Sequence, residues 1–262
     1  MPSSRRRGLS AAGGVLLSAA LSAALSAGLL AAPATAATRV APAAPATPAA
    51  PATPAALVTA PAAARQPFPG KSATQIKKIS AGVAAKARTV HAAGYDIDPG
   101  LGRISFDMVI APNGAKGWIR LVKKKATAQL IRVGNTIYLQ PDARFGGPDF
   151  APGGALYGTW IRVPRTQAQY KQIVPITVIS SWAKLIGSLT VSRRTDGGTM
   201  GGTPTVRLYQ PGAKGGSIYV ATAGPAFPRL VATSDKTVRY ALYDWNKAVA
   251  PITAPPADQL AG

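Results

Sequence analysis

Three short runs of β-forming residues close the folded part of the chain, and they constrain its architecture more than any other stretch. The first run is 217–221, the second ends at Thr233 and the third ends at Tyr243. Gly-Pro and Ser-Asp turns separate them. Because connections this short cannot return a chain to a parallel neighbour, the runs predict an antiparallel meander. We expect this meander to be one edge of a larger sheet that earlier elements cover.

The composition excludes most kinds of catalytic site. The chain has no Cys, no Glu, one His and nine Asp. It therefore has no disulfide framework, thiolate nucleophile, thiolate zinc site or lipobox cysteine. Few His and carboxylate side chains are available for a metal site or for a pair of acid/base carboxylates, and no G-x-S-x-G nucleophile elbow is present. We therefore expect that the protein is not an enzyme and that it has no catalytic residues, no bound metal and no cofactor.

The charge balance points to polyanionic partners. Thirty Lys and Arg against nine Asp give a formal net charge of +21. Such a charge keeps a domain soluble and attracts anionic lipid headgroups, wall polymers or nucleic acid. We expect no nucleic-acid partner, because the chain carries export features and no recognised nucleic-acid-binding module.

The N-terminus carries the features of an export signal. Arg5, Arg6 and Arg7 precede an apolar stretch at 9–30, and Ala34-Thr35-Ala36 fits the small-x-small cleavage rule. We interpret 1–36 as a signal peptide cleaved before Ala37. A retained membrane anchor is the alternative, but the Ala, Ser and Gly content makes a weak one. The segment 4–9 also resembles a twin-arginine signal, so Sec and twin-arginine export both stay open. We expect a secreted or envelope-associated protein.

A linker follows the signal peptide. Residues 37–70 are almost entirely Ala, Pro and Thr, with a repeated six-residue unit at 44–49 and 50–55. Such a segment buries too little apolar area to fold, and its prolines favour extended polyproline II. It is either a passive tether or an O-glycosylated stalk, and the folded domain is expected at 71–262.

The first part of this domain predicts a helix followed by strands. Apolar residues at three- and four-residue spacing predict an amphipathic helix over 71–93, capped by Ser72 or Thr74 and ended by Gly94. His91 near its C-terminus is interpreted as structural. Period-two alternation then predicts four meander strands, over 103–110, 117–122, 126–133 and 136–139. Frequent Gly and basic residues favour a strongly curved sheet.

The second part predicts a loop, a helix and more strands. The Gly/Pro-rich stretch 142–158 is expected to be a functional loop at the rim of the sheet. A strand at 158–164 and a helix over 166–187 follow, the helix serving either as a core helix or as a lid on a lipid-filled space. Further strands at 188–194 and 203–210 lead to the closing meander. About ten strands and two main helices give an α+β fold: one antiparallel sheet covered by helices.

The ordered set of these segments resembles the LolA-like fold family, most closely the LppX/LprG group of lipoproteins from mycobacteria and other actinobacteria. The resemblance is carried by 133–139, 158–164, 217–220 followed by 228–230, and 244–246 leading to 254–258. It implies a curved half-barrel sheet and two or three helices around a hydrophobic cavity that holds acyl chains. This chain departs from the group because it has no lipobox cysteine.

The resemblance implies a lipid or other acyl-chain ligand and particular residues to hold it; we expect a monomer. A cation run at 123–125 is either a headgroup site or a solvated turn. The expected cavity lining is Ile104, Phe106, Met108, Ile119, Leu121, Ile137, Trp160, Ile176, Ile179, Trp182 and Ile186, and the expected headgroup residues are Arg120, Arg132 and Arg162. The alternative is a non-catalytic envelope-associated interaction or sensory module that binds anionic wall or membrane material by charge.

Overall fold

The computed structural model describes residues 68–212 and 215–261. The expected signal peptide at 1–36 and nearly all of the linker at 37–70 lie outside this part of the chain. Among the helices of the described residues, none has the length and apolar content needed to cross a membrane.

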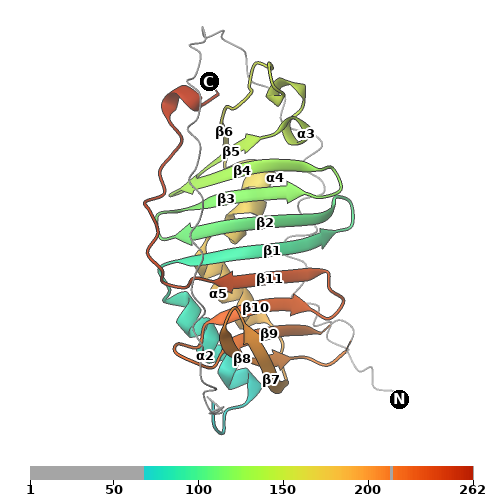
Figure 1. Cartoon of the computed structure of the whole chain (residues 1–262), viewed down its shortest axis with the longest axis vertical. Helices are drawn as coiled ribbons and strands as arrows, with labels where there is room; N and C mark the ends of the chain where they lie inside the picture. The colour runs from blue at the N-terminus through green and yellow to red at the C-terminus, as the bar shows by residue number, and fades with distance from the viewer. Residues whose placement is uncertain (1–67, 213–214, 262) are drawn as a thin grey trace, which may run out of the picture.

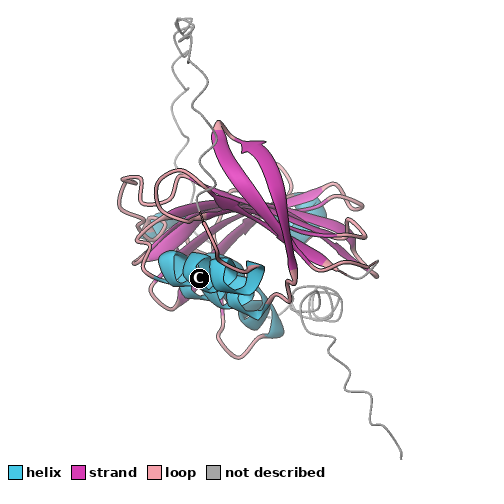
Figure 2. Ribbon diagram, turned by 90° about the horizontal axis from the view of Figure 1, so that it is seen from below, coloured by secondary structure: helices cyan, strands magenta, loops and turns pink. Residues whose placement is uncertain are grey.

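One eleven-stranded sheet forms the body of the molecule, and every neighbouring pair of strands in it is antiparallel (Figure 1). Its strand order is β6-β5-β4-β3-β2-β1-β11-β10-β9-β8-β7. The sheet is curved and carries helices on one face (Figure 2). The predicted α+β class and curved antiparallel sheet are therefore confirmed. The strands are β1 Val90–Asp98, β2 Gly102–Ala111, β3 Gly114–Leu121, β4 Ala126–Val133, β5 Thr136–Pro141, β6 Ile161–Val163, β7 Arg193–Met200, β8 Thr203–Tyr209, β9 Gly216–Ala221, β10 Pro228–Thr233 and β11 Val238–Tyr243.

The closing meander lies in the middle of the sheet, so its predicted position at an edge is wrong. β11 pairs with β1, with His91 opposite Tyr243 and Asp96 opposite Val238. The edge strands are β6 and β7. The cause is β1 itself, a strand that the sequence pattern did not reveal and that joins the N-terminal and C-terminal meanders.

The helix predicted over 71–93 is shorter and leaves room for β1. Helix α2 spans Ala73–Ala85 and begins with a capping box between Ser72 and Gln75. Lys86 ends it, and Gly94, expected to stop the helix, lies within β1. Its register partner is Tyr240, and a Cβ added to Gly94 would lie 2.1 Å from the backbone oxygen of Arg239. The glycine therefore allows two strands to approach closely.

The second predicted helix, over 166–187, is broken into three pieces. They are α4 Ala168–Ile173, the 3-10 turn η2 Val174–Thr177 and α5 Ile179–Ser188. Pro175 removes a backbone donor at the first break, and Val178 has extended backbone angles at the second. The loop 142–158 contains two short turns, α3 Ala143–Gly146 and η1 Pro148–Phe150. A further turn, η3 Ala257–Gln259, lies near the C-terminus.

Two apolar clusters lie on opposite faces of the sheet. The larger fills the space between the sheet and α2, α4 and α5; we call this the inner face. The smaller lies on the outer face, where Ile252 of the C-terminal tail packs with Ile131 and Trp160. Trp160 also forms a parallel bridge with Leu260. The tail thus runs along the strand ends back to the β6 edge (Figure 1).

Candidate functional site

Most of the residues expected to line a cavity lie on the inner face. They are covered by α2, α4, η2 and α5, which together we call the helical layer. Alternation along β2 turns Ile104, Phe106 and Met108 to this face, and their register partners on β3 continue it. Ile179 is partly buried and packs against this cluster. The buried members are Ile104, Phe106, Met108, Ile119, Leu121, Ile137, Ile176, Trp182 and Ile186.

Three aromatic rings occupy the centre of this space. Trp182 of α5 lies with its ring centroid 6.0 Å from Phe106 and 5.4 Å from Tyr240, and Phe106 and Tyr240 are 5.6 Å apart. Burial raises the pKa of the Tyr240 hydroxyl far above its usual range, and the nearby Asp96 carboxylate adds to the shift. The side chains of this face therefore meet at its centre in this conformation.

Hydrogen bonds from Arg132 and Tyr170 tie η2 and α4 to the strands, whereas the bonds of α5 run to neighbouring helices. Neither α4, η2 nor α5 has a side-chain hydrogen bond at its N-cap. Trp182 Nε1 donates to the Ile176 carbonyl at 3.3 Å, inside the layer. Lys77 of α2 donates to the carbonyls of Gly187 and Leu189 at 2.9 and 2.7 Å. Packing of Trp182 is thus the main link between α5 and the middle of the sheet.

Trp160 departs from the expected lining. It belongs to the outer-face cluster with Ala111, Ile131 and Ile252. The strand expected at 158–164 is reduced to Ile161–Val163, and Trp160 precedes it. The sequence pattern did not distinguish the two faces, because an apolar residue at a strand end fits either one.

The three arginines expected to bind a headgroup do not form one site. Arg132 lies on the inner face and is 8% exposed; its guanidinium donates to the Thr177 carbonyl at 2.9 and 3.2 Å and to the Gly134 carbonyl at 2.6 Å. Desolvation by burial lowers its pKa. Arg120 and Arg162 are exposed and alternate to the outer face. Only Arg132 therefore lies beside the helical layer.

A histidine–aspartate pair on the outer face was not anticipated. His91 Nε2 lies 2.5 Å from Asp107 Oδ1, and the imidazole packs 4.2 Å from the ring of Tyr243. Burial raises the pKa of Tyr243, with Asp107 and Asp244 contributing. The pair was missed because His91 had been assigned to a helix. The described residues hold no group of three or more side chains able to ligate a metal.

A pocket of about 620 Å³ also lies on the outer face, at the β4–β5 end of the sheet. Thr127 and Gln129 of β4 and Gln140 of β5 form its floor, and the loop 142–158 forms its wall with Phe150 and Tyr157. Sequence reasoning singled out this loop for its length and its aromatic residues, without locating the pocket it forms.

The fold is a single curved antiparallel sheet with helices on one face. The chain is similar to the crystal structure of LprF from Mycobacterium bovis, with a TM-score of 0.46 and 15% identity over 70% of this chain and 96% of that one. It is also similar to the lipoprotein LppX from Mycobacterium tuberculosis, with a TM-score of 0.44 and 16% identity over 68% and 97%. The likeness concerns the fold alone. No family model and no curated protein sequence matches the chain.

Proposed function

We propose that the protein binds the acyl chains of a lipid between the inner face of the sheet and the helical layer, outside the cytoplasm in the cell envelope. The observation that carries this proposal is the position of Trp182. A continuous apolar face is closed at its centre by one side chain, and that side chain comes from a short helix without a side-chain cap. Moving α5 outward would expose apolar surface both on the inner face of the sheet and on the helix.

The magnitudes favour such an opening when a lipid is present. A sixteen-carbon chain moved out of water gains on the order of 13 kcal/mol, at about 0.8 kcal/mol for each methylene. Withdrawing Trp182 from Phe106 and Tyr240 loses two aromatic pairs, each worth about 0.5–1.5 kcal/mol beyond area burial. Acyl carbons would replace the apolar contacts that the indole gives up. When the chain comes from a bilayer instead of water, the gain nearly vanishes, because the bilayer and the protein site are both apolar. The lipid can therefore exchange between protein and membrane.

Arg132 gives the proposed site a polar end. Its charge is buried beside η2, and it makes no ion pair with any residue in the described part of the chain. An anionic headgroup near η2 would meet this cation, since a charge removed from water gains from an opposite partner. Arg120 and Arg162 lie on the other face and have no part in this site.

The direct test compares two tryptophans on opposite faces. Trp182→Leu shortens the side chain that closes the inner face, whereas Trp118→Leu makes the same change on the outer face, where Trp118 pairs with Gln129. With a pyrene-labelled sixteen-carbon fatty acid, we expect the full chain to bind and Trp182→Leu to bind several-fold more tightly, because less packing must be displaced. Trp118→Leu should bind as the parent does. No binding by any of the three would refute the proposal.

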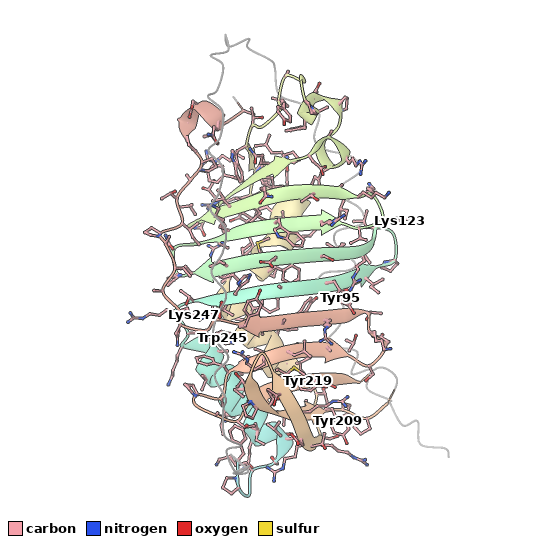
Figure 3. All side chains as sticks on the ribbon, in the orientation of Figure 1. Tyr95, Lys123, Tyr209, Tyr219, Trp245 and Lys247 are labelled. Atoms are coloured by element: carbon pink, nitrogen blue, oxygen red, sulfur yellow. The ribbon has the colours of Figure 1, made fainter. Side chains whose placement is uncertain are left out.

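A second candidate function is attachment to anionic wall or membrane material through charge. The observation that favours it is the excess of cations: the sequence has thirty Lys and Arg but only nine Asp and no Glu, so most of the cations have no acidic side chain to pair with. Lys123 and Lys247 lie at opposite ends of the strands (Figure 3). Retention on phosphatidylglycerol vesicles that disappears in high salt, with phosphatidylcholine vesicles as control, tests this candidate.

A further inference from the structure

The outer-face pocket is a built site with its own polar chemistry, separate from the inner face. Asp142 Oδ2 accepts from the backbone N–H of Thr127 at 2.8 Å, and its Oδ1 accepts from the backbone N–H of Phe145 at 2.8 Å. Gln140 Nε2 donates to the Gly158 carbonyl at 2.7 Å. The bonds to Thr127 and from Gln140 tie the two ends of the loop 142–158 to β4 and β5, and the bond from Phe145 caps α3 within the loop. The pocket wall is therefore held in place over the strands.

The free charge in the pocket is positive. Lys125 and Arg144 line it and are exposed, and neither forms an ion pair within the described residues. The one carboxylate, Asp142, already accepts two backbone hydrogen bonds, which partly offset its field. An anion entering the pocket would therefore meet two cations whose charge is not yet matched.

The remaining lining combines amides with an exposed aromatic ring. Gln129 makes no side-chain hydrogen bond to another described residue, and Gln140 keeps its carbonyl oxygen available as an acceptor. Tyr157 is 52% exposed, one of the few large apolar side chains left open to solvent. Amides can donate to and accept from hydroxyl groups, while a tyrosine ring offers an apolar surface with a polar tip. This combination suits a ring that is hydroxylated at its edge and apolar on its C–H face.

From these features we infer that the outer-face pocket binds an acidic saccharide, a sugar carrying a carboxylate or phosphate group. Its volume of about 620 Å³ falls in the range of roughly 300–1,000 Å³ for small-ligand sites. An acyl chain fits poorly, because it would bury Gln129, Lys125 and Arg144 without partners.

The surface beside the pocket extends the site toward a longer chain. On β3, Trp118 lies opposite Gln129 and Arg120 lies opposite Thr127, so both side chains continue the pocket floor. Neighbouring strands are ~4.8 Å apart, which places these two residues within reach of the next sugar unit. Arg120, expected to bind a lipid headgroup, therefore acquires a different role, and the ligand can be an oligosaccharide.

This site does not depend on lipid binding at the inner face. The pocket gives the second candidate function, attachment to anionic material, a defined location. Attachment through cations elsewhere on the surface does not require the pocket. The two are separable, because a pocket responds to a single side chain and to sugar stereochemistry, whereas diffuse attraction responds to total charge and salt.

The test measures binding of three probes to the full chain by titration calorimetry and saturation-transfer NMR: a glucuronate-containing disaccharide, its neutral glucose counterpart and inorganic phosphate. We expect the acidic disaccharide to bind more tightly than either of the others. Tyr157→Ala should weaken it about tenfold and Arg144→Ala several-fold. Tyr157→Phe, which keeps the ring, should retain binding.

The control for Arg144→Ala is Lys123→Ala, which also removes one positive charge but at a residue of the β3–β4 turn outside the pocket lining. It should leave binding unchanged. The inference is overturned by any of three results: no binding of the acidic disaccharide, phosphate binding equally well, or Lys123→Ala weakening binding as much as Arg144→Ala. The last two would indicate a diffuse cationic surface.

Discussion

The indole of Trp182 meets the ring of Tyr240 edge-on, with ring centroids 5.4 Å apart and planes at 82°. Edge-to-face packing is one of the favoured arrangements of aromatic pairs, because the positive ring edge faces the negative ring face. The contact joins α5 to β11, which pairs with β1 at the junction of the two halves of the sheet. The closed state of the inner face therefore depends on it.

Loss of this contact should destabilise the fold. Trp182→Ala is expected to lower the free energy of unfolding by about 3–5 kcal/mol, because a buried indole is replaced by a cavity. Trp118 is half-buried on the outer face, so Trp118→Ala should lower the free energy of unfolding clearly less. Urea denaturation followed by circular dichroism measures both. Equal losses would show that Trp182 is not a central packing residue.

Alkaline pH should destabilise the protein through Tyr240. The pKa of this hydroxyl is raised in the folded state, so its stabilising effect is complete below the unfolded pKa near 10 and declines above it. While only the unfolded chain releases the proton, the unfolding free energy should fall by about 1.4 kcal/mol for each pH unit. Tyr240→Phe should remove this part of the slope between pH 10 and 12. An unchanged slope in the variant would contradict the assignment.

The architecture was predictable because strand alternation and short turns are local signals. Strands β2 to β5 and the closing meander follow directly from period-two patterning. β1 was missed because Ala87 and Val90 continue the helical spacing of α2, although Val90 and Ala92 also fit a strand that buries every second residue. Only tertiary pairing with β2 and β11 decides between the two, and a single sequence does not display it.

Two close approaches of neighbouring strands should be intolerant of any side chain. A Cβ at Gly94 would lie 2.1 Å from the Arg239 oxygen, and one at Gly117 would contact the Asp107 oxygen. Gly94→Ala and Gly117→Ala should therefore force the backbone apart and lower the melting temperature markedly. The control is Gly82→Ala in α2, where no atom lies within 4 Å; it should stabilise by up to about 1 kcal/mol. Stable Gly94→Ala protein would contradict this account.

Arg132 should hold η2 against the sheet. Arg132→Met keeps the length of the side chain but leaves the Thr177 and Gly134 carbonyls without their donor. The Thr177 acceptor is buried and, left unsatisfied, costs about 1–3 kcal/mol, whereas water can replace the donor at exposed Gly134. Hydrogen exchange should accelerate in η2 and the start of α5, while α2 should exchange as in the parent. Acceleration spread evenly over the chain would indicate a global loss of stability instead.

The site was harder to predict than the fold. Alternation correctly placed Ile104, Phe106 and Met108 on one face, since burial follows the strand period. Strand alternation gives no information on Trp160, which precedes strand β6, or on the face of the sheet on which each arginine lies. The outer-face pocket arises from hydrogen bonds between the loop 142–158 and strands remote from most of it, such as the Gln140–Gly158 bond. No local pattern encodes such contacts.

The most direct test of lipid binding is native mass spectrometry of the full chain, purified without detergent from cells that make it. The account predicts an additional mass corresponding to an acyl lipid, which is lost after extraction with organic solvent and restored by incubation with lipid vesicles. Only the bare polypeptide mass, both before extraction and after incubation with vesicles, would contradict it.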